Sequence, residues 1–172
     1  MKVYKKTMNV TLRPATADDI SEILEIVNHA IAHTTAIYDY EPRTHEMQLS
    51  WLADKKAAGF PVIVAEYEGR AIAFGAYGKF RQRAAYNSTV EHSVYVNEKY
   101  HGNGIGRMLL SELVRLAKAQ KLHLMIGAID ASNAGSIEFH KRMGFTETAV
   151  IREVAFKFGR WLDLMLMELR LE

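Results

Sequence analysis

The 172-residue sequence contains no cysteine, which excludes a disulfide framework, a thiolate-ligated metal site and a cysteine nucleophile. Charges nearly balance, with 22 basic and 20 acidic side chains, so net charge gives no indication of nucleic-acid binding. No apolar run approaches the roughly 18 residues that a membrane span needs. The basic start MKVYKKTM also lacks the apolar core of a signal peptide. These absences predict a cytoplasmic protein with neither nucleic acid nor membrane as a partner.

The composition that is present is typical of a globular domain, with 49% hydrophobic and 24% charged residues. A chain of this length can bury a substantial core as one domain. The sequence contains no linker, internal repeat or low-complexity segment. We therefore predict a single α+β domain over residues 1–172, with residues 1–8 as an N-terminal extension.

Strand-like and helix-like patterns alternate along the chain. Thr16, Thr44 and Asn133 stand where helices begin. Thr16, with Asp19 three residues on, and Asn133 can also cap a helix, because their side-chain oxygens can accept hydrogen bonds from a first helical turn. Glu68-Gly69 between two apolar runs indicates a hairpin, and Gly144 indicates a helix end. The predicted strands are residues 9–15, two in the hairpin 61–78, and 89–96, 122–129, 146–154 and 161–171. Helices are predicted to begin at residues 16, 44 and 133, and directly after the glycines of HGNGIGR.

The segment HGNGIGR, residues 101–107, lies between a predicted strand and an apolar-periodic helix. Its three alternating glycines remove side chains from the path of a ligand, while unpaired N–H groups and the dipole of a helix start favour an anion. Arg107 adds a cation in the first turn. The spacing matches neither the dinucleotide fingerprint nor a P-loop. A tight turn with positive φ is the alternative reason for glycine, but three glycines beside an arginine favour phosphate binding.

HGNGIGR after SVYV resembles the signature of the GNAT superfamily of acyl-CoA-dependent N-acetyltransferases. Gly104 and Gly106 match it, and His101 stands where Gln or Arg is usual. NAGSIEFHKRMGF, residues 133–145, resembles the second landmark of that family, with His140 where tyrosine is usual. The resemblance covers nearly the whole chain. It implies an α/β/α sandwich in which a mixed sheet of about seven strands, splayed at the acetyl-CoA site, carries about four helices.

By this resemblance acetyl-CoA is the co-substrate, and no metal is needed. Its pyrophosphate would bind the amides of residues 102–107, and its pantetheine arm would run beside residues 94–96 like an added strand. Asn133 would help to position it, although Asn is also among the best residues for capping a helix. The predicted cofactor-binding residues are Val94, Tyr95, Val96, His101, Gly102, Asn103, Gly104, Ile105, Gly106, Arg107, Asn133 and Ser136.

GKFRQRAAYNSTVEHSVYV, residues 78–96, resembles more closely the phosphinothricin and methionine sulfoximine acetyltransferase subfamily, as does KFGRWLDL near the C-terminus. This resemblance implies a homodimer and a small amino-acid-like acceptor. Arginine pairs bidentately with a carboxylate, so the arginines of this segment are candidates to hold the acceptor, with Arg83 favoured over Arg81. A solvated loop is the alternative. The predicted acceptor residues are Phe80, Arg81, Arg83, Tyr86 and Thr35, with Tyr38 and Arg43 as further candidates.

The chemistry calls for a modest base, because an α-amine with a pKa of about 8 is already roughly one-tenth neutral at pH 7. Glu91 follows the predicted acceptor loop and can take the proton, directly or through water, if burial raises its pKa. A surface ion pair is the alternative role. His140 would protonate the leaving thiolate, or would be a hydrogen-bonded residue on a buried helix face. A backbone N–H near Val94 would stabilise the oxyanion.

We therefore predict an N-acetyltransferase that moves acetyl from acetyl-CoA to the primary amine of a methionine sulfoximine, methionine sulfone or phosphinothricin type of acceptor, by direct attack in a ternary complex. The alternatives are a protein N-terminal or lysine acetyltransferase, which would need an open peptide groove, and a non-catalytic acyl-CoA-binding module, which would not need Glu91. His29 and His33 lie one helical turn apart, but no third ligand is evident, so we predict no metal site.

Overall fold

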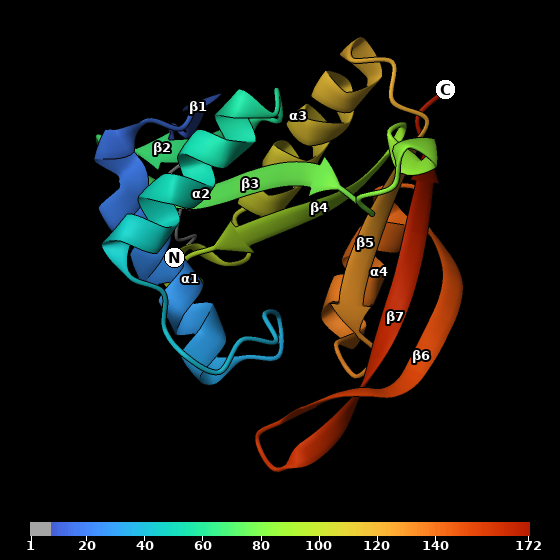
Figure 1. Cartoon of the computed structure of the whole chain (residues 1–172). Coiled ribbons are helices and arrows are strands. Elements are labelled where there is room, and N and C mark those ends of the chain that lie inside the picture. The colour runs from blue at the N-terminus through green and yellow to red at the C-terminus, as the bar shows by residue number, and fades with distance from the viewer. Residues whose placement is uncertain (1–7) are drawn as a thin grey trace, which may run out of the picture.

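Seven strands form one mixed sheet in the computed structural model, which describes residues 8–172 (Figure 1). All but the last residue of the predicted N-terminal extension lies outside the described residues. The elements are β1 (Thr11–Pro14), α1 (Ile20–His33), α2 (His45–Ala57), β2 (Val62–Tyr67), β3 (Arg70–Lys79), β4 (Thr89–Val96), α3 (Ile105–Ala119), β5 (Leu124–Asp130), α4 (Ala134–Arg142), β6 (Thr146–Lys157) and β7 (Arg160–Arg170). Short 3₁₀ turns cover residues 17–19, 84–86 and 98–100.

The strand order is β1-β2-β3-β4-β5-β7-β6. All neighbouring strands are antiparallel except β4 and β5. Those two pair for only three residues, from Thr89 opposite Leu124 to Glu91 opposite Ile126, and then diverge (Figure 1). The rest of β4 therefore has no strand partner on its β5 side, which gives the sheet the splayed form that the family resemblance implied.

Helices cover both faces of the sheet, so the α/β/α prediction is confirmed. Alternate residues of a strand point to opposite faces. Accordingly, Val62 and Val64 of β2 pack in a buried cluster with α1, whereas Ile63 packs in a second cluster with α3. Helix α2 adds Trp51, which meets Phe74 edge-on at 6.0 Å. Two cores, one on each face, hold the sheet in place.

Helix ends follow the signals in the sequence. The Thr44 hydroxyl accepts a hydrogen bond from the Met47 N–H at 3.2 Å, and the Asn133 side chain accepts one from the Ser136 N–H at 3.0 Å. Gly144 has a φ of 91°, which suits the residue that ends a helix. The cap predicted at Asn133 is thus confirmed, and Thr44 caps the start of α2 in the same way.

The last two strands form a long hairpin that projects from the body at the lower end of Figure 1. Lys157 pairs with Arg160 across a two-residue turn in which Phe158 and Gly159 have φ values of 53° and 74°. Such turns match the twist of the strands. Strand β6 therefore runs to Lys157, three residues beyond the predicted end. We call residues 150–161 the β6–β7 arm. No helix in the described part of the chain is long and apolar enough to cross a bilayer.

Candidate active site

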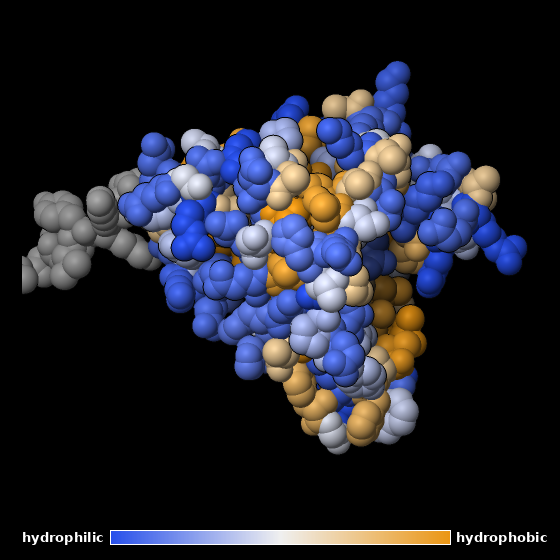
Figure 2. All heavy atoms as spheres, turned by 60° about the vertical axis from the view of Figure 1, so that its left-hand side comes forward, coloured by the Kyte–Doolittle hydropathy of each residue, from blue (hydrophilic) through white to orange (hydrophobic). Residues whose placement is uncertain are grey.

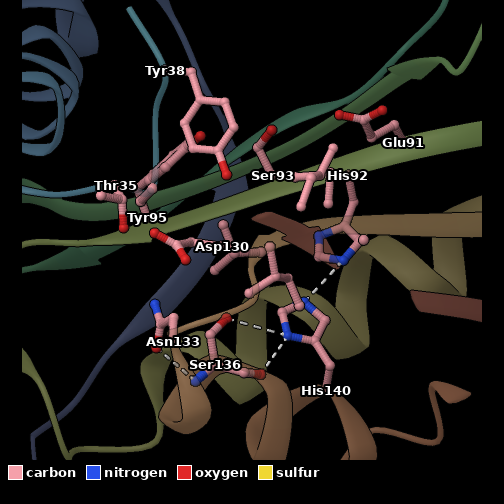
Figure 3. A pocket seen from close by; sticks show the side chains of 16 residues that line it. Thr35, Tyr38, Glu91, His92, Ser93, Tyr95, Asp130, Asn133, Ser136 and His140 are labelled. Atoms are coloured by element: carbon pink, nitrogen blue, oxygen red, sulfur yellow. Dashed lines mark hydrogen bonds between the residues drawn. The ribbon is translucent and has the colours of Figure 1, made fainter. Parts of the chain in front are cut away.

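A cavity of about 330 Å³ opens where β4 and β5 diverge (Figure 3). It is walled by residues 91–95 of β4, 127–130 of β5, the loop after α1 and one side of α4. A second cavity of about 510 Å³ shares Thr35, Val94, Tyr95, Asn133 and Ser136 with it and extends to His101. We call them the central and the outer cavity. Because the two cavities adjoin at these residues, they form a channel that leads from His101, at the start of the glycine loop, to Glu91.

In the glycine loop, glycine is required both for a positive φ and for open space beside the backbone. Gly102 and Gly104 have φ values of 75° and 78°, a conformation that disfavours other residues. A Cβ atom added to either would meet nothing within 4 Å, so both also leave open space beside the start of α3. Gly106 lies inside the helix without a positive φ. The first N–H groups of α3 thus face an unobstructed approach, as anion binding requires.

His101 supports this loop from below. A ring nitrogen lies 2.8 Å from the Val96 carbonyl oxygen, so its N–H donates to the backbone of β4. The Asn103 side chain donates to the carbonyl oxygens of Tyr100 and His101 at 3.0 and 3.3 Å. In this arrangement both side chains stabilise the turn, and the backbone supplies the donors that face the approach.

Glu91 lies at the last position of β4 that pairs with β5, directly opposite Gly78 of β3. The Lys55 ammonium reaches over Gly78, where an added Cβ would come within 2.3 Å of Nζ, and donates to the Tyr77 carbonyl at 3.0 Å. Although Glu91 reaches solvent through the cavity, partial burial raises the pKa of its carboxyl. The charges of Arg81 and Lys55 oppose that rise. Glu91 therefore has the environment of a modestly tuned base.

A pair of histidines lies beneath the central cavity (Figure 3). His140 Nδ1 lies 2.7 Å from the Ser136 carbonyl oxygen, which can only accept, so Nδ1 carries the proton. His140 Nε2 must then accept from His92 Nε2, which is 3.2 Å away. Burial lowers the pKa of His92 to about 3 and that of His140 below its usual value, so both rings are neutral. This geometry agrees with a hydrogen-bonded role for His140, and a proton-donor role would require the pair to rearrange.

The loop after α1 brings Thr35 and Tyr38 to the cavity opposite Asp130, which ends β5 (Figure 3). Asp130 is 4% exposed and accepts hydrogen bonds from the Ser132 N–H and hydroxyl, both at 2.8 Å. Burial would raise the pKa of Asp130, but hydrogen bonds from Thr35 and Ser132 and the charge of Arg160 hold it below its usual value. The buried Tyr38 hydroxyl has no hydrogen-bond partner among the described residues. On this side, the cavity thus presents the Asp130 carboxylate and the Tyr38 hydroxyl.

The predicted acceptor loop after β3 lies only partly near this site. Phe80 and Tyr86 pack edge-on at 6.0 Å, and the Arg81 guanidinium lies over the Phe80 ring at 4.8 Å. The charge of Arg81 reaches Glu91, as the pKa of that carboxyl shows. Arg83 is exposed and precedes the 84–86 turn. The central and outer cavities are lined by none of the four predicted residues of this loop, Phe80, Arg81, Arg83 and Tyr86, in the single chain.

Sequence reasoning missed Asp130, His92 and Lys55. Asp130 had a usable signal, because it stands at the carboxyl end of a strand just before the helix-capping Asn133. His29, considered as a metal ligand, instead lies 3.3 Å from Glu98, and the described residues contain no group of three possible metal ligands.

This architecture and channel agree with the comparisons to known proteins. Residues 12–166 match the family model described as "Acetyltransferase (GNAT) domain", so the chain belongs to the GNAT acetyltransferase family. It is an acetyl-CoA-dependent N-acetyltransferase of this family. The chain is 40% identical over 163 residues to the L-methionine sulfoximine/L-methionine sulfone acetyltransferase of Salmonella typhimurium, covering 95% of each sequence. It is 32% identical to the phosphinothricin N-acetyltransferase of Streptomyces viridochromogenes, covering 90% of this chain and 84% of that one.

A solved acetyltransferase from Salmonella typhimurium, in complex with acetyl-CoA, superimposes with a TM-score of 0.92 at 40% identity, covering 95% of this chain and 94% of that one. The residues of the present chain fit the same co-substrate. The open approach at Gly102 and Gly104 suits phosphates, and the unpaired side of β4 at Val94–Val96 suits the amides of a pantetheine arm.

Proposed function

We propose that this protein acetylates the α-amine of a small amino acid of the methionine sulfoximine, methionine sulfone or phosphinothricin class. The observation that carries the proposal is the position of Glu91. It lies where β4 and β5 separate, at the inner end of the channel from the glycine loop, with a carboxyl pKa raised by burial. The names of the relatives support the acceptor class, and a cavity of about 330 Å³ suits a free amino acid better than a protein surface.

Each part of the channel has a distinct task in this proposal. Acetyl-CoA supplies an activated acetyl group. The amides after Gly102 hold its phosphates, and a β4 N–H near Val94 donates to the oxygen that gains charge during attack. Glu91 accepts the proton of the amine directly or through a water, and burial, which raises the carboxyl pKa, makes it a better proton acceptor.

The acceptor is held by side chains around the central cavity. Thr35 and the Tyr38 hydroxyl can bond its polar groups, while Asp130 offers an acceptor to its ammonium or sulfoximine N–H. An arginine of the loop after β3 holds its carboxylate, with Arg83 preferred by resemblance and Arg81 nearer to Glu91 within one chain. His140 remains the candidate donor to the leaving thiolate.

An acceptor screen tests this function. Release of free CoA is measured for the purified protein with methionine sulfoximine, methionine sulfone, phosphinothricin, other amino acids, lysine-containing peptides and N-terminal peptides. We expect turnover with the first group and none above background with peptides. Better turnover with peptides would favour a protein acetyltransferase, and no turnover with any amine would favour an acyl-CoA-binding module.

We also propose that two copies of the chain associate through the β6–β7 arm. Figure 2 shows hydrophobic atoms gathered on the projecting lower end of the molecule, and patches of this kind mark interaction surfaces. Phe158 and Trp161 are 56% and 59% exposed. The exposed apolar side chains of the arm are Val150, Ile151, Val154, Phe156, Phe158 and Trp161.

Light scattering after gel filtration tests the dimer. We expect twice the chain mass for the parent and a shift toward monomer for Trp161→Glu. Met47→Glu is the matched control, because Met47 is 56% exposed on α2, away from the arm. Equal masses for the two variants would place the contact elsewhere. The cytoplasmic location stays a prediction.

A further inference from the structure

Lys157, the last residue of β6, is a buried cation without an acidic partner. It is 3% exposed, and none of its contacts in the described chain is a salt bridge. Its ammonium instead donates to the carbonyl oxygens of Ile31, Thr34 and Ile37 at 2.7, 2.8 and 2.6 Å. An ammonium has three donors, and all three are used. Because burying a charged group costs free energy, we expect the Lys157 ammonium to have a specific structural role.

The three carbonyls explain why a cation is stable here. Ile31 lies in the last turn of α1, and Thr34 directly follows that helix. The final carbonyls of a helix have no partner within it, and the helix dipole makes this end negative. The Lys157 ammonium therefore completes the end of α1 and holds the loop that follows it.

This loop forms one wall of the central cavity. Thr35 and Ala36 lie between the bonded carbonyls of Thr34 and Ile37, and Tyr38 follows immediately. A second contact joins the same two segments, since the Tyr40 hydroxyl donates to the Phe156 carbonyl at 2.5 Å. The tip of the β6–β7 arm thus holds the cavity loop at two points, one of them through a buried charge.

We propose that Lys157 is a positioning residue for the acceptor side of the active site. Its ammonium acts as a built-in cation that fixes Thr35 and Tyr38 against the central cavity, so the acceptor site depends on the arm. Lys157 lines neither cavity, and none of its hydrogen bonds reaches the glycine loop. The inference rests on the proposed acceptor site.

The absence of cysteine allows an atom-by-atom test. The variant Lys157→Cys is alkylated in denaturant with 2-bromoethylamine, which forms a lysine isostere, or with 1-bromopropane, which forms its uncharged counterpart. Both products are refolded and checked by mass spectrometry. Lys56→Cys, at an exposed position on α2, is treated identically as the matched control.

We expect the propylated Lys157→Cys protein to have an acceptor KM at least tenfold above that of the aminoethylated one, with acetyl-CoA affinity within twofold. Hydrogen exchange of residues 34–38, measured without acceptor, should be faster in the propylated protein. The two Lys56→Cys products should match each other. Lys157→Met, expressed without chemical treatment and compared with the parent, gives the same test if refolding fails for both products.

Three outcomes would overturn the inference. Equal acceptor KM and equal hydrogen exchange in the two products would show that the ammonium holds nothing in place. A parallel loss of acetyl-CoA affinity, or a propylated protein that alone fails to refold, would assign Lys157 to general stability. If the parent acetylates no amino acid, the proposed function fails, while hydrogen exchange of residues 34–38 still decides the positioning role.

Discussion

The two sides of the active-site channel are built in different ways. On the co-substrate side, the backbone groups come from one continuous segment, made of the end of β4, the glycine loop and the start of α3. The acceptor side is assembled from side chains of separate segments, including Thr35 after α1, Glu91 of β4 and Asp130 of β5. Lys157, at the tip of the arm, holds one of these segments from outside.

This difference separates co-substrate binding, which is general, from acceptor recognition, which is specific. A backbone cradle tolerates sequence change as long as its glycines keep their conformation, so it can serve one co-substrate in many enzymes. A wall of side chains from distant segments changes its selectivity with single substitutions. Mutations on the two sides should therefore have separable effects, on acetyl-CoA affinity in one case and on turnover or acceptor affinity in the other.

Glu91→Gln should give the largest effect and leave the co-substrate side intact. Turnover at neutral pH should fall by about 10² or more, because the amine loses its base. The loss should shrink at high pH, where the amine deprotonates itself. A pH–rate profile checks this, with acetyl-CoA affinity by calorimetry as the control. Profiles of the same shape and height in variant and parent would assign Glu91 to structure.

Arg83→Ala and Arg81→Ala should act differently on the acceptor side. If Arg83 holds the acceptor carboxylate, its loss should lower kcat/KM about ten- to a hundredfold. Arg81→Ala should move the acid limb of the profile to higher pH, because the charge that lowers the Glu91 pKa is gone. Kinetics with a free and an amidated acceptor measure both effects. An amide as good as the free acid would refute the arginine grip.

Gly104→Val should weaken acetyl-CoA binding about tenfold by obstructing charge-assisted contacts, while acceptor KM stays unchanged. Gly69→Val is a matched control, because Gly69 has a φ of 77° against 78° for Gly104, and an added Cβ meets open space at both. Backbone strain is therefore common to both variants. Calorimetric titration with acetyl-CoA should separate them, and equal affinities in the two would argue against the cradle.

The histidine pair beneath both sides should make stability depend on pH. The pKa of His92 is lowered to about 3 in the folded state, so below pH 6.5 the unfolded chain binds the extra proton first. The contribution of His92 to the free energy of unfolding is therefore fully present above pH 6.5 and is lost as the pH drops toward 3. The expected loss is about 1 kcal/mol between pH 7.5 and 5.5. Urea unfolding at the two pH values measures this loss. His92→Phe should show less of it, and an equal loss in both proteins would point to other groups.

The sequence predicted most of the fold and those parts of the site that are built from neighbouring residues. Thr44, Asn133 and Gly144 act on their own neighbours, and the glycines shape a single loop, so short-range patterns were enough. Lys157 was not found, because its partners Ile31, Thr34 and Ile37 lie far away along the chain. Asp130 was missed although its place at the end of a strand was a usable signal. The position of Arg83 relative to the cavity could not be predicted either, because the sequence pattern identifies only that Arg83 lies in a loop.

The early separation of β4 and β5 has a consequence for handling the protein. It leaves a row of unpaired backbone groups inside a sheet, the kind of edge through which chains aggregate. Here α1, α4 and the loop after α1 flank that edge, so a foreign strand meets side chains before it meets the free backbone. The cavities along this edge nevertheless leave a path for a ligand. Storage with acetyl-CoA should therefore slow precipitation by closing the gap between the strands.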